Sequence, residues 1–303
     1  MQYTDIMFNS YLERKIMCIN NRRESYCEYD IKHLRQILEE ADAILIGAGS
    51  GLSAAAGLTY SGSRFEENFK DFIEEYGLRD MYSAGFYPYG TPERYWGYWS
   101  RHVYHNRYEF KGNDVYRNLF SLVRDKDYFV LTTNVDHQFQ LNGFDKKRLF
   151  YTQGDYGLFQ CSKPCHQKTY DNKEIIYKMV ESQKNLKIPS DCIPYCEKCG
   201  APMTMNLRID DTFVQDEGWY KAQENYKQFL LKHQNSRIVF LELGVGGNTP
   251  GIIKYPFWSM TKTFPSAIYV CINKGDVTCV NSIIDKAVLI DDDIKTVLEN
   301  LKN

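Results

Sequence analysis

The chain has 303 residues, of which 43% are hydrophobic, and its formal net charge is −2. This length and composition can bury a sizeable core, as one large domain or as two smaller ones. The nearly balanced charge argues against a nucleic acid or an anionic membrane as a partner.

Targeting signals and membrane spans are not expected from this sequence. Residues 1–5 carry no basic segment that leads into an apolar stretch, so we expect no secretory signal. No apolar run approaches the roughly 20 residues that span a bilayer. Without a secretory signal, the 9 cysteines indicate reduced thiols, some of them holding metal. We therefore predict a cytoplasmic protein.

The first expected element is a helix capped by Asp30. Aspartate is a favourable capping residue, and apolar residues recur after it at helical spacing. Those residues are Ile31, Leu34, Ile37 and Leu38. The helix leads into a short apolar strand at residues 43–46.

A glycine-rich turn follows that strand. Gly49, Gly51 and Ala54 fit the G-x-G-x-x-G/A spacing of dinucleotide-binding sites. Glycine permits the tight turn, and the backbone amides of residues 49–53, where the next helix begins, are expected to face a phosphate. An ordinary strand–helix turn can have the same pattern, so the interpretation depends on the rest of the chain.

Further short apolar segments predict a sheet. Their composition is typical of parallel strands buried on both faces, and they lie near residues 128–132, 148–151, 238–243, 267–271 and 286–290. Polar residues and glycines come just after several of them, where ligands bind in open α/β sheets. We predict an α/β fold with a Rossmann-like parallel sheet and helices on both faces.

Two segments interrupt this pattern. Residues 63–126 carry helical patterns and are expected to form a helical insertion. Its aromatic residues either pack in a core or form a surface that holds a protein substrate or closes over a cofactor; they include Tyr95, Trp96 and Trp99, with Val103 beside them. We expect a nucleotide-binding domain of residues 1–155 and 206–303, and a small inserted module of residues 156–205.

The inserted module contains two short-spaced cysteine pairs. The four residues are Cys161, Cys165, Cys196 and Cys199. Two such pairs can supply four thiolates to a tetrahedral zinc ion, and Gly200 suits the turn. Cys192 can replace one ligand, His166 is a lesser alternative, and the pairs can also be free thiols in a ribbon that has lost its metal. Four protein ligands leave no open coordination position, so we expect the zinc to be structural.

The order and content of these segments resemble the sirtuin (Sir2) family of NAD-dependent enzymes. Residues 49–58 resemble the family's G-A-G-I-S-x-S-A-G-I. Residues 132–136, Thr-Thr-Asn-Val-Asp, resemble its T-Q-N-I-D, with Gly143 at that motif's closing glycine. Gly244 opens a loop like the family's G-T-S loop, and Asn273 ends a match to its I-N. The resemblance spans roughly residues 40 to 300, and the family's zinc ribbon lies where the cysteine module lies.

The departures from the family pattern indicate one branch of it. The family's P-D-F-R appears as residues 59–62, Thr-Tyr-Ser-Gly, and the histidine of its L-H-G motif appears as Gln153. These changes, with an aromatic segment at residues 80–88, resemble the macrodomain-linked class M sirtuins. That resemblance implies a protein ADP-ribosyltransferase rather than a deacylase. Arg64 and Phe65 either take the roles of the missing arginine and phenylalanine or leave the cofactor less covered.

The resemblance implies NAD as co-substrate and places the reaction on three residues. Asn134 and Asp136 would hold the ribose and the carboxamide, and Gln153 would face the ribose. The residues expected to bind NAD are Ala48, Gly49, Ser50, Gly51, Leu52, Ser53, Thr133, Asn134, Asp136, Gln153, Gly244, Val245, Gly246 and Asn273.

Gln153 decides between the possible activities. Histidine titrates near neutral pH and can act as a base, whereas glutamine can hydrogen-bond to the ribose but cannot take its proton. Losing a general base typically costs ~10²- to 10⁴-fold in rate. Deacylation should therefore be feeble, while transfer of ADP-ribose to a strong external nucleophile is still expected.

We therefore predict an NAD-dependent protein ADP-ribosyltransferase. The implied target is a lipoyl-carrier protein of the glycine-cleavage H type, modified after lipoylation, with a macrodomain protein as a further partner. A weak deacylase and a non-catalytic NAD-sensing module are the alternatives.

Several other polar residues carry open interpretations. Glu242, beside the Gly244 loop, either points to the cofactor or pairs with a backbone group. His102, His105 and His137 are expected to be satisfied polar residues rather than catalysts.

Overall fold

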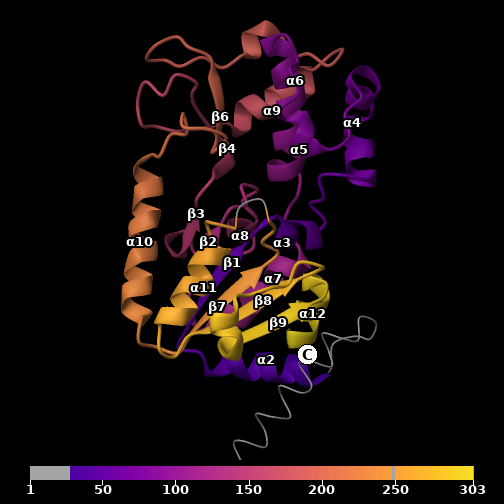
Figure 1. The fold of residues 1–303 in the computed structure, drawn as a ribbon. Helices are drawn as coiled ribbons and strands as arrows, with labels where there is room; N and C mark the ends of the chain where they lie inside the picture. Colours follow the sequence, from indigo (N-terminus) through magenta and orange to yellow (C-terminus); the bar gives the residue numbers. More distant parts are fainter. Residues whose placement is uncertain (1–27, 248–249, 303) are drawn as a thin grey trace, which may run out of the picture.

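The structure of the protein, a computed structural model, describes residues 28–247 and 250–302 (Figure 1). Its larger sheet has six parallel strands in the order β3-β2-β1-β7-β8-β9. They are β1 (Ala43–Ala48), β2 (Asp127–Thr132), β3 (Leu149–Tyr151), β7 (Ile238–Leu243), β8 (Ile268–Asn273) and β9 (Ala287–Asp291). All the predicted strands are found, and the predicted Rossmann-like parallel sheet is confirmed.

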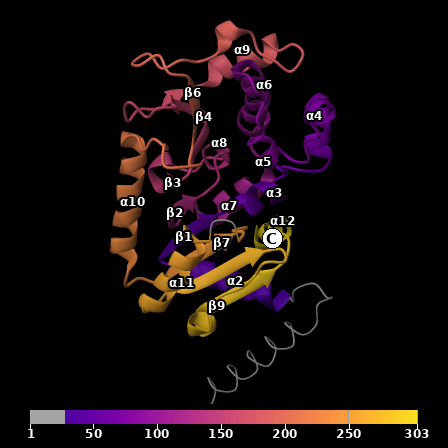
Figure 2. The same ribbon diagram turned by 45° about the horizontal axis from the view of Figure 1, so that its top comes forward.

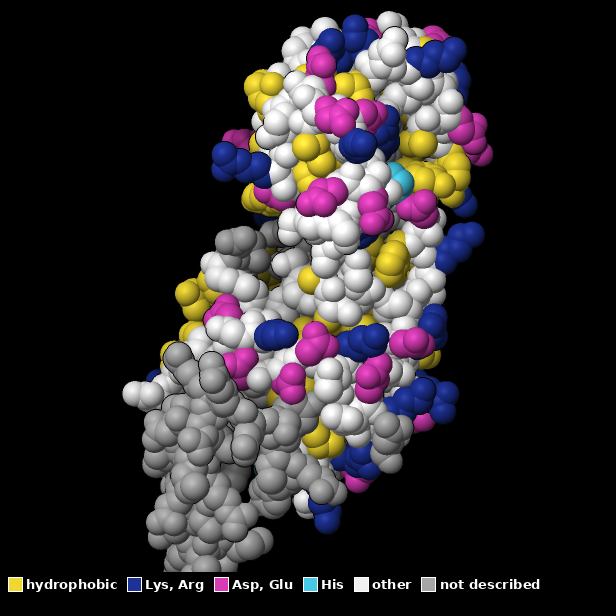
Figure 3. Space-filling view, turned by 90° about the vertical axis from the view of Figure 1, so that its right-hand side faces the viewer, with side chains coloured by type: hydrophobic (Ala, Val, Ile, Leu, Met, Phe, Trp, Pro, Cys, Tyr) yellow, Lys and Arg dark blue, Asp and Glu magenta, His cyan; other side chains and the backbone are white. Residues whose placement is uncertain are grey.

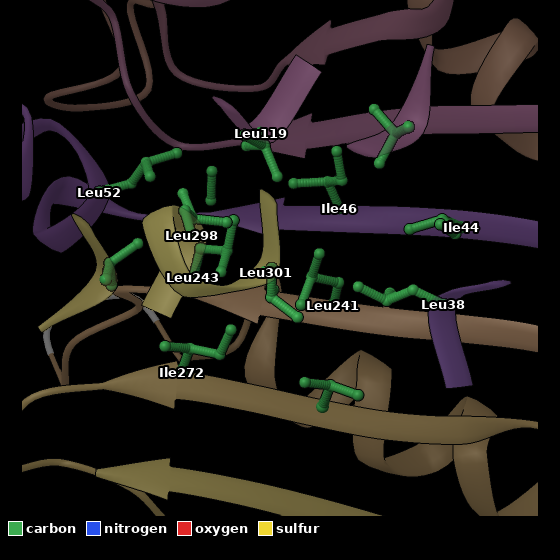
Figure 4. Packing of buried hydrophobic residues seen from close by; sticks show 14 of the residues in the cluster. Leu38, Ile44, Ile46, Leu52, Leu119, Leu241, Leu243, Ile272, Leu298 and Leu301 are labelled. Atoms are coloured by element: carbon green, nitrogen blue, oxygen red, sulfur yellow. The ribbon is translucent and has the colours of Figure 1, made fainter. Parts of the chain in front are cut away.

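Helices cover both faces of this sheet (Figures 1 and 2). One face carries α2 (Glu28–Glu40), α3 (Ser50–Ala55), α7 (Asp114–Val123) and α12 (Ile294–Lys302), and the other carries α10 (Glu217–His233) and α11 (Lys254–Thr263). Side chains of β1 alternate between the two cores. Ile44 and Ile46 pack with the α2 and α12 side (Figure 4), and Leu45 packs with the α10 and α11 side. This two-sided burial explains the unbroken apolar runs in the sequence.

The upper part of the molecule in Figures 1 and 2 has its own sheet and its own core. The antiparallel strands are β4 (Gly154–Cys161), β5 (Tyr170–Asp171) and β6 (Met203–Leu207), in the order β5-β4-β6. They share one apolar cluster with α4 (Ser63–Tyr76), α5 (Met81–Ala84), α6 (Pro92–Val103) and α9 (Lys173–Ser182). Trp96, Trp99 and Val103 are buried there, and Tyr95 packs against them, so these residues form a core.

Short elements connect these parts. They are η1 (Tyr104–Tyr108), a π-helical turn that continues α6, with α8 (Gln138–Leu141), η2 (Lys146–Arg148), η3 (Ser190–Cys192) and η4 (Asn281–Lys286). No described helix has the length and apolar character needed to cross a membrane. On the face seen in Figure 3, acidic and basic side chains are interspersed.

Two details differ from the sequence analysis. Helix α2 already includes Glu28, so Asp30 lies inside the helix and the prediction that it caps it is wrong. The apolar face is as predicted, with Leu34 fully buried, because packing on the sheet fixes a face more strongly than a single capping residue fixes a boundary. Helix α7, expected within the helical insertion, packs against α12 on the large sheet.

The predicted domain boundaries fall inside strands. The boundary at 155/156 lies within β4, and the boundary at 205/206 lies within β6. The cysteine module and the helical insertion also share one apolar cluster. The division into two domains at these positions stays a prediction.

Candidate functional site

The strand order of the large sheet reverses between β1 and β7. In doubly wound sheets, ligands bind beside the carboxyl ends of the strands at such a point. The glycine-rich turn after β1 and the Gly244 loop after β7 meet there. The polar ends of β2 and β3 complete the candidate site.

Close approach of the two loops requires glycine. A Cβ atom on Gly49 would lie 2.6 Å from Gly244 O, and one on Gly51 would lie 2.7 Å from Gly244 Cα. Gly244 has a φ of 62°, in the left-handed region, and a Cβ there would overlap Leu52 N. The predicted glycine signature therefore serves a backbone-to-backbone contact.

Two amides of the glycine turn donate to residues at the end of β7, and a third, Leu52 N, donates to Gly49 O at 3.1 Å. Gly49 N donates to Leu243 O at 3.0 Å, and Gly51 N donates to Gly244 O at 2.9 Å. The expectation that the amides of residues 49–53 together face a phosphate is therefore corrected for these three groups. The Gly49 and Gly51 hydrogens hold the β1 turn against the β7 loop.

Ser53 is the centre of a buried hydrogen-bond network. Its Oγ donates to Asp136 Oδ2 at 2.5 Å and lies 2.9 Å from Tyr116 OH. Asn134 Nδ2 donates to Ser53 Oγ at 3.0 Å and to Gly49 O at 2.9 Å. The network joins the first turn of α3, helix α7 and the segment after β2, so three predicted site residues do come together.

The donor in each hydrogen bond of this network follows from the groups involved. Because the single Ser53 hydroxyl hydrogen goes to Asp136, the Tyr116 hydroxyl must donate to Ser53. Both amide hydrogens of Asn134 point inward, and no described group donates to Asn134 Oδ1. The side of this network that is open to a ligand thus presents oxygen acceptors.

Asp136 is almost completely buried. Loss of solvation raises its pKa, although the hydrogen bond from Ser53 acts in the opposite direction. Its second oxygen, Oδ1, accepts a hydrogen bond from Gln138 N at 3.1 Å. The carboxylate is therefore fixed in place before any ligand arrives.

Gln153 lies between β3 and β4. Its backbone oxygen accepts a hydrogen bond from Arg208 N at 3.0 Å. Its side chain is half-buried, and it makes no hydrogen bond to any residue in the part of the chain that the structure describes. A half-buried amide without an internal partner is available to a ligand.

A buried ion cluster stands beside Gln153. Asp155 binds His137 Nδ1 at 2.7 Å and Arg107 Nε at 2.8 Å, and Arg107 comes from the π-helical turn η1. Despite burial, which favours the neutral acid, the hydrogen bond from His137 and the charge of Arg107 hold the pKa of Asp155 below its usual range. His137 and Asp155 line one small pocket with Asn134 and Asp136.

The other predicted NAD-binding residues divide by burial. Leu52 and Val245 point into apolar cores, so only their backbone can approach a ligand. Ser50 and Gly246 are exposed, and Thr133 is half-buried.

The remaining two candidates make hydrogen bonds within the protein. Ala48 O accepts hydrogen bonds from Thr133 N at 3.1 Å and from Thr132 Oγ1 at 2.9 Å. Asn273, at the end of β8, donates to Asp276 O at 3.1 Å and so shapes that turn.

The segment after the glycine turn places two candidates differently. Phe65 is buried and stacks on Phe69, so it is a core residue and does not cover a cofactor. Arg64 donates to Thr59 O, His105 O and Asn106 Oδ1, each at 2.9 to 3.0 Å. Burial lowers the pKa of Arg64. The arginine ties this segment to η1.

Glu242 has a role that the sequence analysis did not consider. It is completely buried and binds Lys254 Nζ at 2.7 Å and Tyr269 OH at 2.8 Å. Both stated alternatives, a cofactor contact and a backbone pair, are therefore wrong. The residue joins β7 to the first turn of α11 through a buried ion pair. The sequence gives no sign of this pair, because its two members lie on different elements.

The four predicted metal ligands come together. Their sulfur atoms all lie within 4.8 Å of one another, with Cys161–Cys199 at 3.5 Å and Cys165–Cys196 at 3.6 Å. Thiolates bound tetrahedrally to zinc at about 2.3 Å lie about 3.8 Å apart, so the donor set fits that metal.

The two alternative metal ligands lie outside this group. Cys192 Sγ lies 3.9 Å from Ser182 Oγ, at the end of α9. His166 Nδ1 lies 3.0 Å from Cys165 Sγ, and its other ring nitrogen bonds Tyr170 OH at 2.7 Å. His166 therefore sits beside a ligand and is not one of the four.

Sequence reasoning missed several residues around the site. Tyr116 reads as one apolar position of an amphipathic helix, and Arg107 as a helical charge. Tyr60 lies in the segment that departs from the sirtuin pattern, and Tyr156 lies just after the Gln153 motif. Proximity to those motifs was the one available signal for these two tyrosines.

Comparisons with known proteins agree with this geometry. The chain is 41% identical over 266 residues to a protein ADP-ribosyltransferase of Staphylococcus aureus (strain Mu50 / ATCC 700699), covering 88% of this chain and 84% of that protein. It is 31% identical over 278 residues to a probable bifunctional ADP-ribose hydrolase/ADP-ribosyltransferase of Fusarium oxysporum f. sp. cubense, covering 84% of this chain and 45% of that protein. No protein-family model matches the chain.

Solved structures of Sir2 proteins share the fold. Sir2Tm bound to a propionylated peptide superposes with a TM-score of 0.55 at 16% identity, covering 89% of this chain and 95% of that one. Sir2Af2 bound to a myristoylated histone peptide gives 0.54 at 18% identity, covering 91% and 96%. The chain thus belongs to the family of the staphylococcal protein ADP-ribosyltransferase, built on the Sir2 sirtuin fold.

Proposed function

We propose that the protein cleaves the bond between nicotinamide and ribose in NAD and transfers the ADP-ribose to a protein side chain. The observation that carries this proposal is the pairing of two features at one sheet edge. Asn134 and Asp136 offer fixed acceptor oxygens, and Gln153 offers an amide without a partner among the described residues.

The acceptor oxygens suit the chemistry of glycosidic cleavage. As nicotinamide leaves with the bonding electron pair, positive charge develops on the ribose. Asn134 Oδ1 and the Asp136 carboxylate stabilise that charge without reorganising, because hydrogen bonds from the Asn134 amide nitrogen and to both Asp136 oxygens already fix these side chains. The same oxygens orient the ribose hydroxyls and the carboxamide.

Gln153 favours transfer over deacylation. Its amide can orient a ribose hydroxyl but cannot remove the proton, as a histidine could. The acceptor must therefore be nucleophilic by itself. We place the pyrophosphate near exposed Ser50 and Gly246, because the amides of Gly49 and Gly51 are occupied. Zinc, held by the four cysteines, stabilises the smaller sheet and takes no part in the chemistry.

For the protein acceptor, we propose a lipoylated carrier of the glycine-cleavage H type. The support is the resemblance of Gln153 and of residues 59–62 to the class M sirtuin pattern. The name of the fungal relative joins ADP-ribose hydrolase and transferase activities in one protein. That pairing supports a macrodomain hydrolase as a partner. The described cysteines form no disulfide bond with one another, which suits the cytoplasmic location that we propose.

Deacylation is the second candidate function. The observation that favours it is the fold shared with Sir2 proteins bound to acylated peptides. Gln153 opposes it, since the deacylation step needs a base at that position.

Labelled NAD tests the proposal. The protein is incubated with NAD labelled in its adenylate phosphate and with the carrier in lipoylated and unlipoylated forms. Label on the lipoylated carrier alone supports the full proposal. O-acyl-ADP-ribose from an acylated peptide, without carrier labelling, would replace it with deacylation. NAD binding without nicotinamide release would leave a sensing module.

A further inference from the structure

A chain of hydrogen bonds runs from the candidate site into the core of the upper part. Tyr60 OH lies 2.7 Å from Tyr156 OH, and Tyr156 OH lies 2.9 Å from His102 Nε2. His102 Nδ1 lies 3.1 Å from Tyr98 OH, which donates to Met81 O at 2.7 Å. The reaction described above uses none of these five residues.

The direction of every hydrogen bond in the chain follows from its far end. A carbonyl oxygen only accepts, so the Tyr98 hydrogen is committed to Met81 O. Tyr98 must then accept from His102 Nδ1–H, which leaves Nε2 without a hydrogen. Burial lowers the pKa of His102 to about 3, so the ring is neutral and cannot carry a second hydrogen at neutral pH.

The same reasoning reaches Tyr60. Because Nε2 only accepts, the Tyr156 hydroxyl donates to it, and Tyr156 in turn accepts from Tyr60. The Tyr60 hydrogen therefore points inward. Tyr60 Oη therefore has lone pairs, and no hydrogen, left for a ligand.

Tyr60 stands next to the site loop. Tyr156 N donates to Val135 O at 2.9 Å, and Val135 lies between Asn134 and Asp136. Tyr60 is half-buried, and burial, reinforced by the charge of the Asp136 carboxylate, raises the pKa of Tyr60 to about 12, so its hydroxyl is neutral. The segment that carries Tyr60 replaces the family's P-D-F-R, so the family pattern assigns it no role.

We propose that Tyr60 contacts NAD and accepts a hydrogen bond from the carboxamide N–H of nicotinamide, and that Tyr156 and His102 are positioning residues that keep it an acceptor. This inference rests on the proposed function, which places the carboxamide at Asp136. A carboxamide has two N–H hydrogens, and Asp136 and Tyr60 supply one acceptor oxygen to each.

A cofactor analogue tests the contact directly. In 3-acetylpyridine adenine dinucleotide a methyl ketone replaces the carboxamide, so its N–H donors are absent while its carbonyl is kept. The measured quantity is a ratio of two kcat/KM values: the value for release of nicotinamide from NAD, divided by the value for release of 3-acetylpyridine from the analogue. Comparing this ratio between variants removes the difference in leaving-group reactivity, which is common to all of them.

Tyr60→Phe should lower the ratio by about 3- to 10-fold, the value of one neutral hydrogen bond. His102→Phe keeps a ring in the same aromatic cluster but cannot accept from Tyr156, so Tyr60 can turn its hydrogen outward; the ratio should fall here as well. Tyr89→Phe is the matched control. It removes another buried tyrosine hydroxyl of this core. Tyr89 OH donates to Ala84 O at 2.9 Å and takes no part in the series of hydrogen bonds from Tyr60 to Met81. The kcat/KM ratio of this variant should stay at the wild-type value.

An unchanged ratio in Tyr60→Phe, with folding intact by circular dichroism, would overturn the inference. An equal fall in Tyr89→Phe would overturn it too, since the effect would then be a general loss of packing. Failure of the proposed function has a different signature. Wild-type protein would bind neither NAD nor the analogue in calorimetry, or would release no nicotinamide.

Discussion

Ser53 shows how a single small side chain can organise a site. Its hydroxyl satisfies Tyr116, Asn134 and Asp136 at once, and it does so from the first turn of α3. Removing it would leave the half-buried Asn134 amide, the buried Tyr116 hydroxyl and the buried Asp136 carboxylate each short of a partner. Such groups cost about 1–3 kcal/mol each when unsatisfied, so the hydroxyl serves both stability and the site.

Asn134→Ala should abolish transfer more severely than Gln153→Ala. Asn134 Oδ1 is a fixed acceptor beside the developing charge, and losing such a group costs about 10²- to 10³-fold in kcat. The Gln153 side chain makes no hydrogen bond to the residues at 28–247 or 250–302, so its loss should reduce transfer while the melting temperature hardly changes. Both are measured by labelled-NAD transfer and by thermal melting. Full transfer in both variants would contradict the assigned site.

Gln153→His tests the expectation that the missing base makes deacylation weak. If only the missing base suppresses it, an imidazole at this position should raise O-acyl-ADP-ribose formation from an acylated peptide by up to ~10²-fold. Mass spectrometry of the nucleotide product provides the measurement. No gain would mean that residues 59–62 also block the acyl-lysine reaction.

His102 gives stability a pH dependence. The unfolded chain protonates this histidine near pH 6.5, whereas burial lowers its folded pKa to about 3. Between these values the unfolded state binds more protons, so the free energy of unfolding falls as the pH falls. At pH 5 the loss from this group is about 2 kcal/mol relative to pH 7. His102→Phe lacks this contribution. The difference in free energy of unfolding between wild type and this variant, measured in urea, should therefore shrink by about 2 kcal/mol from pH 7 to pH 5. A difference that is the same at both pH values would contradict the burial of a neutral His102.

At the scale of elements, the structure joins segments that the sequence leaves separate. The turn after β1 touches the loop after β7 through Gly49, Gly51 and Gly244, with no side chains between them. A substitution at one of these glycines should therefore lower the stability of the fold directly, and any effect on NAD binding would follow from that loss.

Gly51→Ala should destabilise the protein by about 1–3 kcal/mol, because its Cβ would lie 2.7 Å from Gly244 Cα. Gly246→Ala, in the same loop region, has open space around its Cβ and should leave the melting temperature nearly unchanged. Differential scanning calorimetry without NAD compares the two. Equal melting temperatures would contradict the close contact of the loops.

The cysteine cluster is the second element-level feature with a direct test. Cys196→Ser should lower zinc to well below one ion per chain and lower the melting temperature, since structural zinc is coupled to folding. Cys192→Ala is the control, because Cys192 lies outside the cluster. Elemental analysis of chelator-free preparations decides the point. Wild-type protein that is folded and free of metal would remove the zinc assignment.

At the scale of the whole molecule, the sequence predicts the frame better than the contacts across it. Periodicity and motif order were sufficient for the parallel sheet, its strands and the four clustered cysteines, because each depends on local pattern or short spacing. The Glu242–Lys254 pair and the Asp155 cluster were not predictable, since the partners lie on different elements and form ordinary helical or strand patterns. The series of hydrogen bonds from Tyr60 to Met81 was not predictable from the sequence for the same reason.

The upper part of the molecule meets the large sheet at the site. Asp155 of β4 binds His137, which follows β2, at 2.7 Å, and Tyr156 N of β4 donates to Val135 O, between Asn134 and Asp136. The reacting groups are therefore held from both sides. This arrangement predicts that bound NAD protects amides in both parts of the chain from hydrogen exchange, and protection confined to the large sheet would contradict it.

The central claim is that ADP-ribose leaves NAD and becomes attached to a protein. Its most direct test follows nicotinamide release and carrier mass together in one reaction with wild-type protein and with Asn134→Ala. We predict one nicotinamide released for each ADP-ribose found on the lipoylated carrier, and both products formed about 10²- to 10³-fold more slowly with Asn134→Ala. Folded wild-type protein that releases nicotinamide while all of the ADP-ribose stays free, or that releases none, would contradict the account.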